Sequence, residues 1–93
     1  MTLKQRAVVF KALGHVARLA MVERLATGEC CVRVLMEMPQ LPKLSGATMS
    51  QHLLVLKGAG IIADEKRGKK IFYRLLMPCL AEIALCEPEG EIS

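Results

Sequence analysis

The sequence has no apolar run that approaches the roughly 20 residues needed to cross a bilayer. Its N-terminus lacks the pattern of a secretory signal peptide. Internal repeats and low-complexity tracts are also missing, and 93 residues suffice for one domain with one core. We therefore expect a soluble, cytoplasmic protein without a membrane partner, formed by a single domain over residues 1–93.

The residues of several common kinds of enzyme are missing too. There is no glycine-rich loop of the type that cradles phosphates. The chain has two histidines, and neither has a sequence context typical of Ser-His-Asp or Cys-His-Asn catalysis. We therefore expect that the protein is not an enzyme.

Apolar residues are, in contrast, abundant, at 53% of the chain. A domain of this size buries only about 60% of the surface that its unfolded chain exposes, so part of this apolar surface needs a second chain to cover it. The composition predicts a homodimer or a larger partner.

Positive charge is concentrated near the end of the chain. Thirteen Lys and Arg exceed nine Asp and Glu, although residues 82–93 hold four glutamates and no base. Five cations crowd into nine positions: Lys66, Arg67, Lys69, Lys70 and Arg74. On a basic chain, such a cluster is typical of nucleic-acid contact.

Helical spacing of apolar residues predicts four helices in the first 60 residues, at 3–13, 16–26, 29–38 and 45–57. In the fourth, Ser45 is suited to cap the N-terminus. Met49, Leu53 and Leu56 share a narrow stripe of this helix. Five residues project in other directions: Ala47, Thr48, Gln51, Leu54 and Val55. One edge of the fourth helix should therefore pack against the core, and another should be free to meet a partner.

The periodicity changes after residue 60. Ile71, Tyr73 and Leu75 alternate with other residues, and residues 67–69 suit a tight turn, which predicts a β-hairpin over 61–76 with a basic tip. Pro78 suits the first turn of a last helix, over 78–87, that is apolar on most sides. We expect this helix and the helix at 3–13 to form the dimer interface.

The order of these elements predicts a mainly α-helical fold with a β-hairpin wing, the winged helix-turn-helix. Residues 29–57 would form the helix-turn-helix and 61–76 the wing. Polar side chains on the last helix of such a motif hydrogen-bond base edges in the major groove, and cations on the hairpin neutralise phosphates. The candidate base-contacting residues are Ser45, Thr48, Ser50 and Gln51. The candidate phosphate-contacting residues are Lys57, Lys66, Arg67, Lys69 and Lys70.

The chain resembles the ArsR/SmtB repressors, small dimeric winged-helix proteins that release operator DNA when an inducer binds. The resemblance covers about residues 5–77. It rests on four segments: ALGHVARLAMVERL at 12–25, GECCVRVL at 28–35, SGATMSQHLLVLKGAGII at 45–62 and GKKIFYRL at 68–75. It adds His52 to the groove-facing candidates, although His52 flanks the stripe of Met49 and Leu53, so a packing role is an equal alternative. The fourth helix differs from the family pattern in having Gln51 and Leu54 where such helices often carry Arg or Lys.

The resemblance also draws attention to the cysteines. In the family, the third helix commonly begins with a Cys-x-Cys pair that binds soft metals or arsenite. Here Cys31 matches the first position of this pair, Arg33 stands at the second, and Cys30 lies one residue earlier. The family's other common site, on the terminal helices, uses His with Asp or Glu, and we discount it because no histidine follows His52.

The sequence is compatible with several roles for the four cysteines. Cys30 and Cys31 could converge on one soft ion at the start of a helix, whose positive end would lower their pKa values. Arsenite needs three sulfurs and structural zinc four ligands, so Cys79 or Cys86, from the same or the partner subunit, would have to join them. Alternatively, a cysteine of the third helix pairs with one on the terminal helix when oxidised or persulfidated. A further alternative is that all four cysteines simply pack as small hydrophobic residues.

These observations predict a sequence-specific, DNA-binding transcriptional regulator, a homodimeric repressor released from a palindromic operator by an effector. A thiophilic metal or metalloid such as arsenite is one candidate for the effector, bound by thiolates as the only cofactor. A thiol-redox or reactive-sulfur signal is a second. A competing class is a cytosolic, thiol-based metal-binding protein that does not read DNA.

Overall fold

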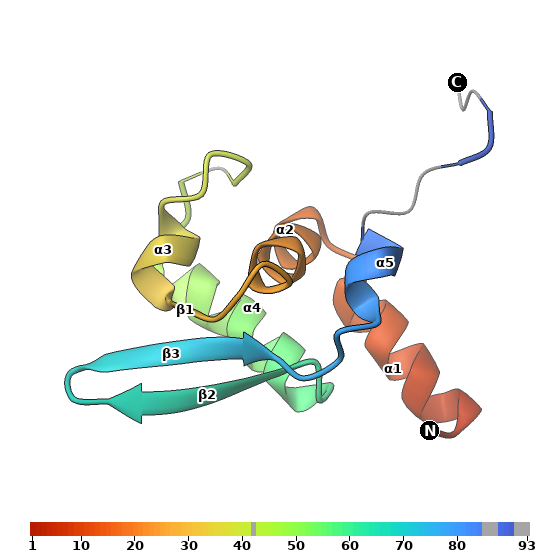
Figure 1. The fold of residues 1–93 in the computed structure, drawn as a ribbon, viewed down its shortest axis with the longest axis horizontal. Helices are drawn as coiled ribbons and strands as arrows, with labels where there is room; N and C mark the ends of the chain where they lie inside the picture. Colours follow the sequence, from red (N-terminus) through yellow and green to blue (C-terminus); the bar gives the residue numbers. More distant parts are fainter. Residues whose placement is uncertain (42, 85–87, 91–93) are drawn as a thin grey trace.

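A computed structural model describes residues 1–41, 43–84 and 88–90. In the described chain, three helices precede a fourth that lies beside a hairpin, and a short helix follows the hairpin (Figure 1). The helices are α1 (Leu3–Leu13), α2 (Val16–Leu25), α3 (Val32–Met36), α4 (Gly46–Gly58) and α5 (Leu80–Ala84), and the strands are β1 (Cys30–Cys31), β2 (Ile62–Arg67) and β3 (Lys70–Leu75). None of the helices in this part of the chain is long and apolar enough to span a membrane.

The predictions for α1, α2 and α4 are confirmed to within about one residue. Thr2 and Gln5 form a reciprocal capping box before α1, with N···O distances of 3.1 and 2.7 Å. Ser45 caps α4 as predicted, because its Oγ accepts a hydrogen bond from the backbone N–H of Thr48 at 3.2 Å. Gly60, at φ +77°, lies just beyond the end of α4, where L side chains are strained.

The predicted hairpin is also confirmed. The two strands pair antiparallel from Ile62 opposite Leu75 to Arg67 opposite Lys70. Gly68 and Lys69 form the turn, and Gly68 has a φ of +63°, as a two-residue hairpin turn requires at its first position. The hairpin extends well beyond the helices (Figure 1).

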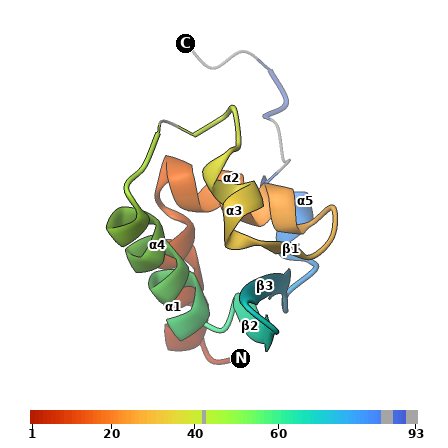
Figure 2. The same ribbon diagram turned by 90° about the vertical axis from the view of Figure 1, so that its left-hand side faces the viewer.

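The predicted third helix, over 29–38, is wrong at its start. Cys30 and Cys31 form a short strand that pairs antiparallel with β3, and α3 begins only at Val32. The sheet therefore has three strands in the order β1-β3-β2. Seen along the wing in Figure 2, α4 lies on one side of the hairpin, and α2 and α3 lie above it.

A single apolar core joins the helices to the base of the sheet. Its fully buried members come from α2, α3, α4 and the start of β2: Met21, Val22, Leu35, Met49, Leu56, Ile61 and Ile62. The core fixes α4 against α1, α2 and β2. The position of α4 relative to the wing is thus set by buried side chains.

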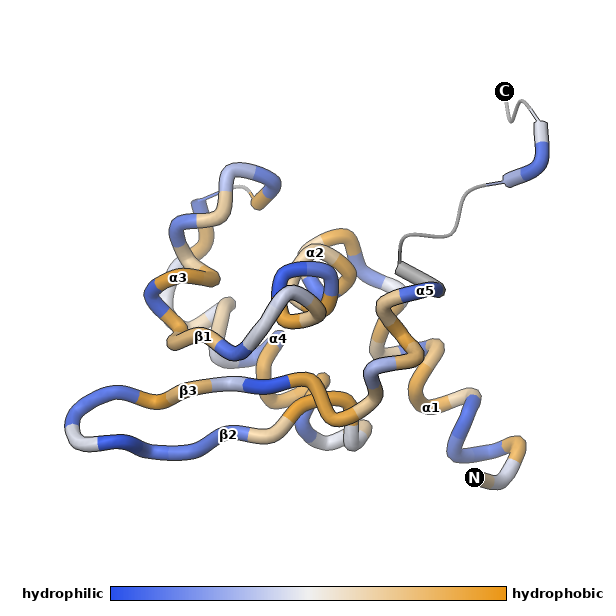
Figure 3. Tube along the Cα trace, viewed as in Figure 1, coloured by the Kyte–Doolittle hydropathy of each residue, from blue (hydrophilic) through white to orange (hydrophobic). Residues whose placement is uncertain are grey.

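Helix α1 carries a second apolar stripe. Val9, Ala12 and Leu13 face the core, whereas Leu3 and Phe10 lie on the opposite side of the helix, 76% and 57% exposed. The hydropathy colouring in Figure 3 shows apolar positions along α1 and in the segment leading into α5. For the last predicted helix, the structure describes α5 at Leu80–Ala84, and the remainder, including Cys86, lies outside the described residues.

Candidate nucleic-acid interface

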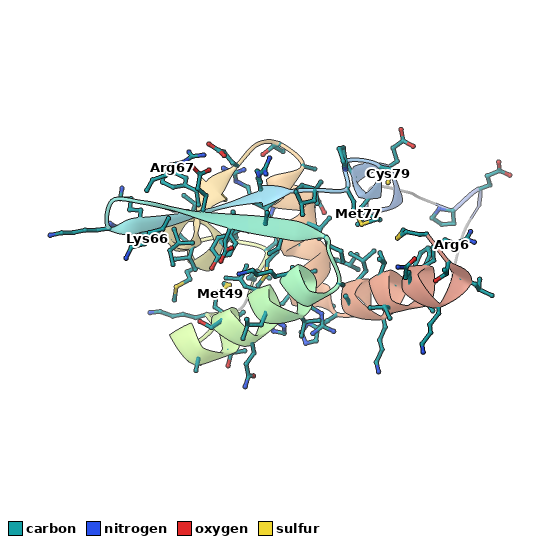
Figure 4. The ribbon with its side chains drawn as sticks, turned by 90° about the horizontal axis from the view of Figure 1, so that it is seen from below. Arg6, Met49, Lys66, Arg67, Met77 and Cys79 are labelled. Atoms are coloured by element: carbon teal, nitrogen blue, oxygen red, sulfur yellow. The ribbon has the colours of Figure 1, made fainter. Side chains whose placement is uncertain are left out.

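Helix α4 has one buried and one exposed side. Met49, Leu53 and Leu56 are buried, as their spacing predicts. Met49 points from α4 toward the sheet in Figure 4. The polar candidates Ser45, Ser50 and Gln51 are exposed, and Thr48 is partly buried beside Ser45, whose Oγ lies 3.0 Å from the Thr48 Oγ1. The exposed edge of α4 therefore presents hydroxyl and amide groups to solvent.

His52 is the exception among the candidates on α4. Its side chain is only 8% exposed, and its ring centroid lies 4.5 Å from that of His15. Arg18 Nη1 lies 3.4 Å from Nδ1 of His52. The prediction that His52 faces the groove is therefore wrong, because the 49, 52, 53, 56 spacing turns it inward.

Protonation of His52 is unfavourable in this environment. Burial lowers its pKa from the usual 6.5, and the neighbouring His15 and Arg18 lower it further. Arg18 can only donate a hydrogen bond, so Nδ1 of His52 must accept it as a neutral ring.

We expect the free energy of unfolding to fall as the pH drops below about 7. The unfolded chain binds a proton at His52 near pH 6.5, whereas the folded chain binds it only at a lower pH, so acid favours unfolding until the folded pKa is reached. Urea unfolding at pH 7.5, 6.5 and 5.5 measures this loss. The His52→Gln variant should lose less stability than wild type over the same range, and parallel pH profiles would contradict the assignment to His52.

Strand alternation divides the cations of the wing between two faces of the sheet. Lys66 shares a face with Asp64 and Tyr73, and this face meets α4, because Lys57 Nζ contacts Asp64 at 3.0 Å. Arg67 and Lys70, paired with each other in the register, lie on the other face. Figure 4 shows Arg67 on the side of the wing away from α4. Of the predicted phosphate contacts on the wing, Lys66 thus lies on the face that meets α4, and Lys69 lies in the turn between the two strands.

Arg67 is bound within the protein. Its guanidinium donates hydrogen bonds to the Glu29 carboxylate at 2.6 and 3.1 Å and to Glu65 at 3.0 Å. It also lies 4.8 Å from the ring centroid of Phe72. The hydrogen bonds from Arg67 lower the pKa of Glu29. Lys66, Lys69 and Lys70 make no ion pair within the part of the chain that the structure describes.

Three of the four cysteines, Cys30, Cys31 and Cys79, lie in the described residues, and the structure does not bring these three together. Successive residues of a strand point to opposite faces, so Cys30 enters the core, 5% exposed, while Cys31 faces outward and is half-buried. The two sulfurs therefore cannot converge on one ion. Cys79 is exposed at the start of α5, on the far side of the molecule from the wing tip (Figure 4). Within the described ranges, no three His, Cys, Asp or Glu side chains are grouped to hold a metal ion.

The predicted drop in cysteine pKa applies to one thiol only. Cys31 is the N-cap of α3, and the backbone N–H of Val34, followed by that of Arg33, lowers its pKa by favouring the thiolate. Burial instead raises the pKa of Cys30. Of these two cysteines, Cys31 is thus the one whose environment favours the thiolate.

Sequence reasoning missed two features of the structure, one beside the wing and one on α1. Glu29, which holds Arg67, lies 38 residues away in the chain, and no local pattern marks this pair. The outer stripe of α1 could have been found, since Leu3, Ala7 and Phe10 have the 3-7-10 spacing of one helix face.

Comparison with known proteins gives several relatives, although no family model matches the chain. The chain is 41% identical over 92 residues to the biofilm growth-associated repressor of Agrobacterium fabrum, covering 92% of this chain and 76% of that protein. It is 35% identical over 77 residues to the HTH-type transcriptional repressor SmtB of Mycobacterium tuberculosis, covering 83% of this chain. It spans only 55% of the length of that repressor.

Solved structures agree with the fold. The transcriptional repressor BigR of Xylella fastidiosa matches with a TM-score of 0.77 and 33% identity, over 88% of this chain and 81% of that one. A homodimeric winged helix-turn-helix DNA-binding domain from Mycobacterium bovis matches with a TM-score of 0.73 and 29% identity, over 89% and 74%. The predicted winged helix-turn-helix fold is confirmed, and the curated relatives are named as regulators rather than as enzymes.

Proposed function

This chain belongs to the ArsR/SmtB family of winged helix-turn-helix regulators, and from that premise we propose that it is a homodimeric repressor that binds operator DNA. The observation that carries the proposal is the placement of α4 beside the wing. Ser50 and Gln51 are exposed on α4, and Lys66 lies on the face of the wing that meets this helix. Base-contacting and phosphate-contacting groups thus share one side of the molecule.

The outer stripe of α1 supports the homodimer. Leu3 and Phe10 expose most of their side chains on the side of α1 that the core does not use, and Leu76, just before α5, is 44% exposed. Burial of this surface against a second copy removes it from water and places two α4 helices on one assembly. Two recognition helices related by a two-fold axis match a palindromic operator.

Selection from a random duplex pool tests this proposal. The purified protein is mixed with 40-base-pair duplexes that carry a randomised centre, and bound duplexes are amplified over several rounds. We expect enrichment of a palindrome whose affinity falls steeply with salt, because each phosphate contact releases counterions. Failure to enrich any sequence, together with salt-independent affinity, would refute the proposal and favour a thiol-based binding protein that does not read DNA.

For the effector, we propose that the responsive group is Cys31 acting as a single thiolate. Cys31 is half-buried, and its pKa is lowered. In the sheet it pairs with Phe72, and the Arg67 guanidinium lies over the Phe72 ring. A group added to its sulfur would therefore lie against the outer face of the wing. This arrangement favours the reactive-sulfur hypothesis over chelation by Cys30 and Cys31 together.

We expect a polysulfide donor to release the selected operator from wild type and from Cys30→Ser, but not from Cys31→Ser. The thiolate of Cys31 attacks a sulfane sulfur of the polysulfide and the adjacent S–S bond of the donor breaks. That sulfur becomes the outer sulfur of a Cys31 persulfide, and the shortened polysulfide leaves as an anion with the electron pair of the broken bond. Fluorescence anisotropy of a labelled duplex measures release, with arsenite added in a parallel series. Equal release from both variants would show that Cys31 is not the responsive group.

A further inference from the structure

The outward face of α4 is almost free of charge. At 100° per residue, Ala47, Gln51 and Leu54 project on the side opposite the buried Met49 and Leu56. All three side chains are exposed. Leu54 is 66% exposed, which leaves a large apolar side chain in water. The one cation of α4, Lys57, is at the end of the helix and is paired with Asp64 at 3.0 Å.

The chemistry of this face limits which bases it can recognise. Bidentate recognition of guanine O6 and N7 needs Arg or Lys, and the centre of the outward face has neither. It offers instead one carboxamide and one branched apolar side chain. In the major groove, a carboxamide matches N6 and N7 of adenine, and an apolar side chain matches the C5-methyl group of thymine.

We propose that Gln51 and Leu54 read A·T base pairs, with Gln51 on an adenine edge and Leu54 on a thymine methyl group. The inference rests on the DNA binding proposed above and adds the class of base pair. Residues three apart on a helix have Cβ atoms about 5–6 Å apart, and successive base pairs are about 3.4 Å apart. The two side chains therefore contact the same base pair or neighbouring ones.

Removal of single thymine methyl groups tests the assignment of Leu54. In the selected duplex, each thymine is replaced in turn by deoxyuridine, and the Kd is measured at one fixed salt concentration. For wild type, we expect one thymine per half-site at which the loss weakens binding about fourfold, or about fifteenfold when both half-sites are changed. Leu54→Ala should bind the thymine and deoxyuridine duplexes equally well.

The matched control is Leu19→Ala, the same substitution at a half-exposed leucine of α2. It should retain the full sensitivity to deoxyuridine. Gln51 is tested in the same way with 7-deazaadenine, which lacks the N7 acceptor: wild type should lose affinity at one adenine per half-site, and Gln51→Ala should not.

If a palindrome is selected but no thymine is sensitive to deoxyuridine, or if Leu54→Ala remains sensitive, the readout by Leu54 is wrong and the repressor proposal stands. If 7-deazaadenine weakens binding at no position, or if Gln51→Ala still loses affinity on that replacement, the readout by Gln51 is wrong. If no duplex is selected at any salt concentration, both proposals fail together.

Discussion

Replacement of Lys66 and Lys69 with alanine is expected to abolish most of the affinity for the selected operator at 0.1 M salt. A dimer would lose four phosphate contacts, two in each protomer. Each contact contributes about −0.9 to the slope of log K against log salt, so the slope should become shallower by about three to four. Relative to 1 M salt, where counterion release contributes nothing, this change of slope corresponds to a loss of affinity of about a thousandfold to ten-thousandfold at 0.1 M salt. Anisotropy titrations between 0.05 and 0.3 M salt measure both quantities.

The double variant Lys70→Ala, Arg74→Ala is the matched control. It removes the same charge from β3, but both residues lie on the face of the sheet away from α4. We expect its slope to change by less than half as much as that of the Lys66, Lys69 variant. Equal changes in the two variants would mean that the division of the wing into two faces does not govern phosphate contact.

That division of the wing follows from the sequence only after the register is known. Alternation over 71–75 predicts a hairpin, but it does not say which face meets α4. The contact between Lys57 and Asp64 answers this, because it ties one face of β2 to the end of α4. The capture of Arg67 by Glu29 is less predictable still, since it joins residues 38 positions apart.

The helices α1, α2 and α4 are predictable because each repeats an apolar pattern over three turns or nearly so. Strand β1 is not, because two residues have no measurable period. It exists because Cys30 and Cys31 find Tyr73 and Phe72 as backbone partners more than 40 residues later. This difference decides the chemistry of the cysteines: neighbours on a helix point about 100° apart, whereas neighbours in a strand point to opposite faces.

The candidate residues of α4 also show what a local sequence pattern can and cannot predict. The spacing of Met49, Leu53 and Leu56 defines the buried stripe. Because His52 lies beside this stripe, the burial of His52 could be predicted from the sequence. Its partners were not, because His15 and Arg18 come from the junction of α1 and α2. The local pattern gives the direction of a side chain, and the fold gives what the side chain meets.

Leu56→Ala is expected to destabilise the protein severely. Leu56 is fully buried where α4 packs in the core, and removal of a buried leucine typically costs about 2–5 kcal/mol of unfolding free energy, through lost burial and the cavity left behind. Domains of this size often have only about 5–15 kcal/mol in total. Denaturant unfolding at a fixed protein concentration measures the loss, since dimerisation makes stability depend on concentration.

The same substitution two residues earlier on α4 is the control. Leu54 is 66% exposed, so Leu54→Ala should change the free energy of unfolding by no more than about 0.5 kcal/mol. A comparable cost at both positions would mean that Leu54 is buried in the assembled protein, against a partner chain or a neighbouring element, and is not available to DNA. If instead the two costs differ as expected, any loss of operator affinity in Leu54→Ala reflects its contact with DNA, because α4 remains folded. The two variants then show that the two faces of α4 have different roles. The inner face stabilises the fold, and the outer face contacts the base pairs.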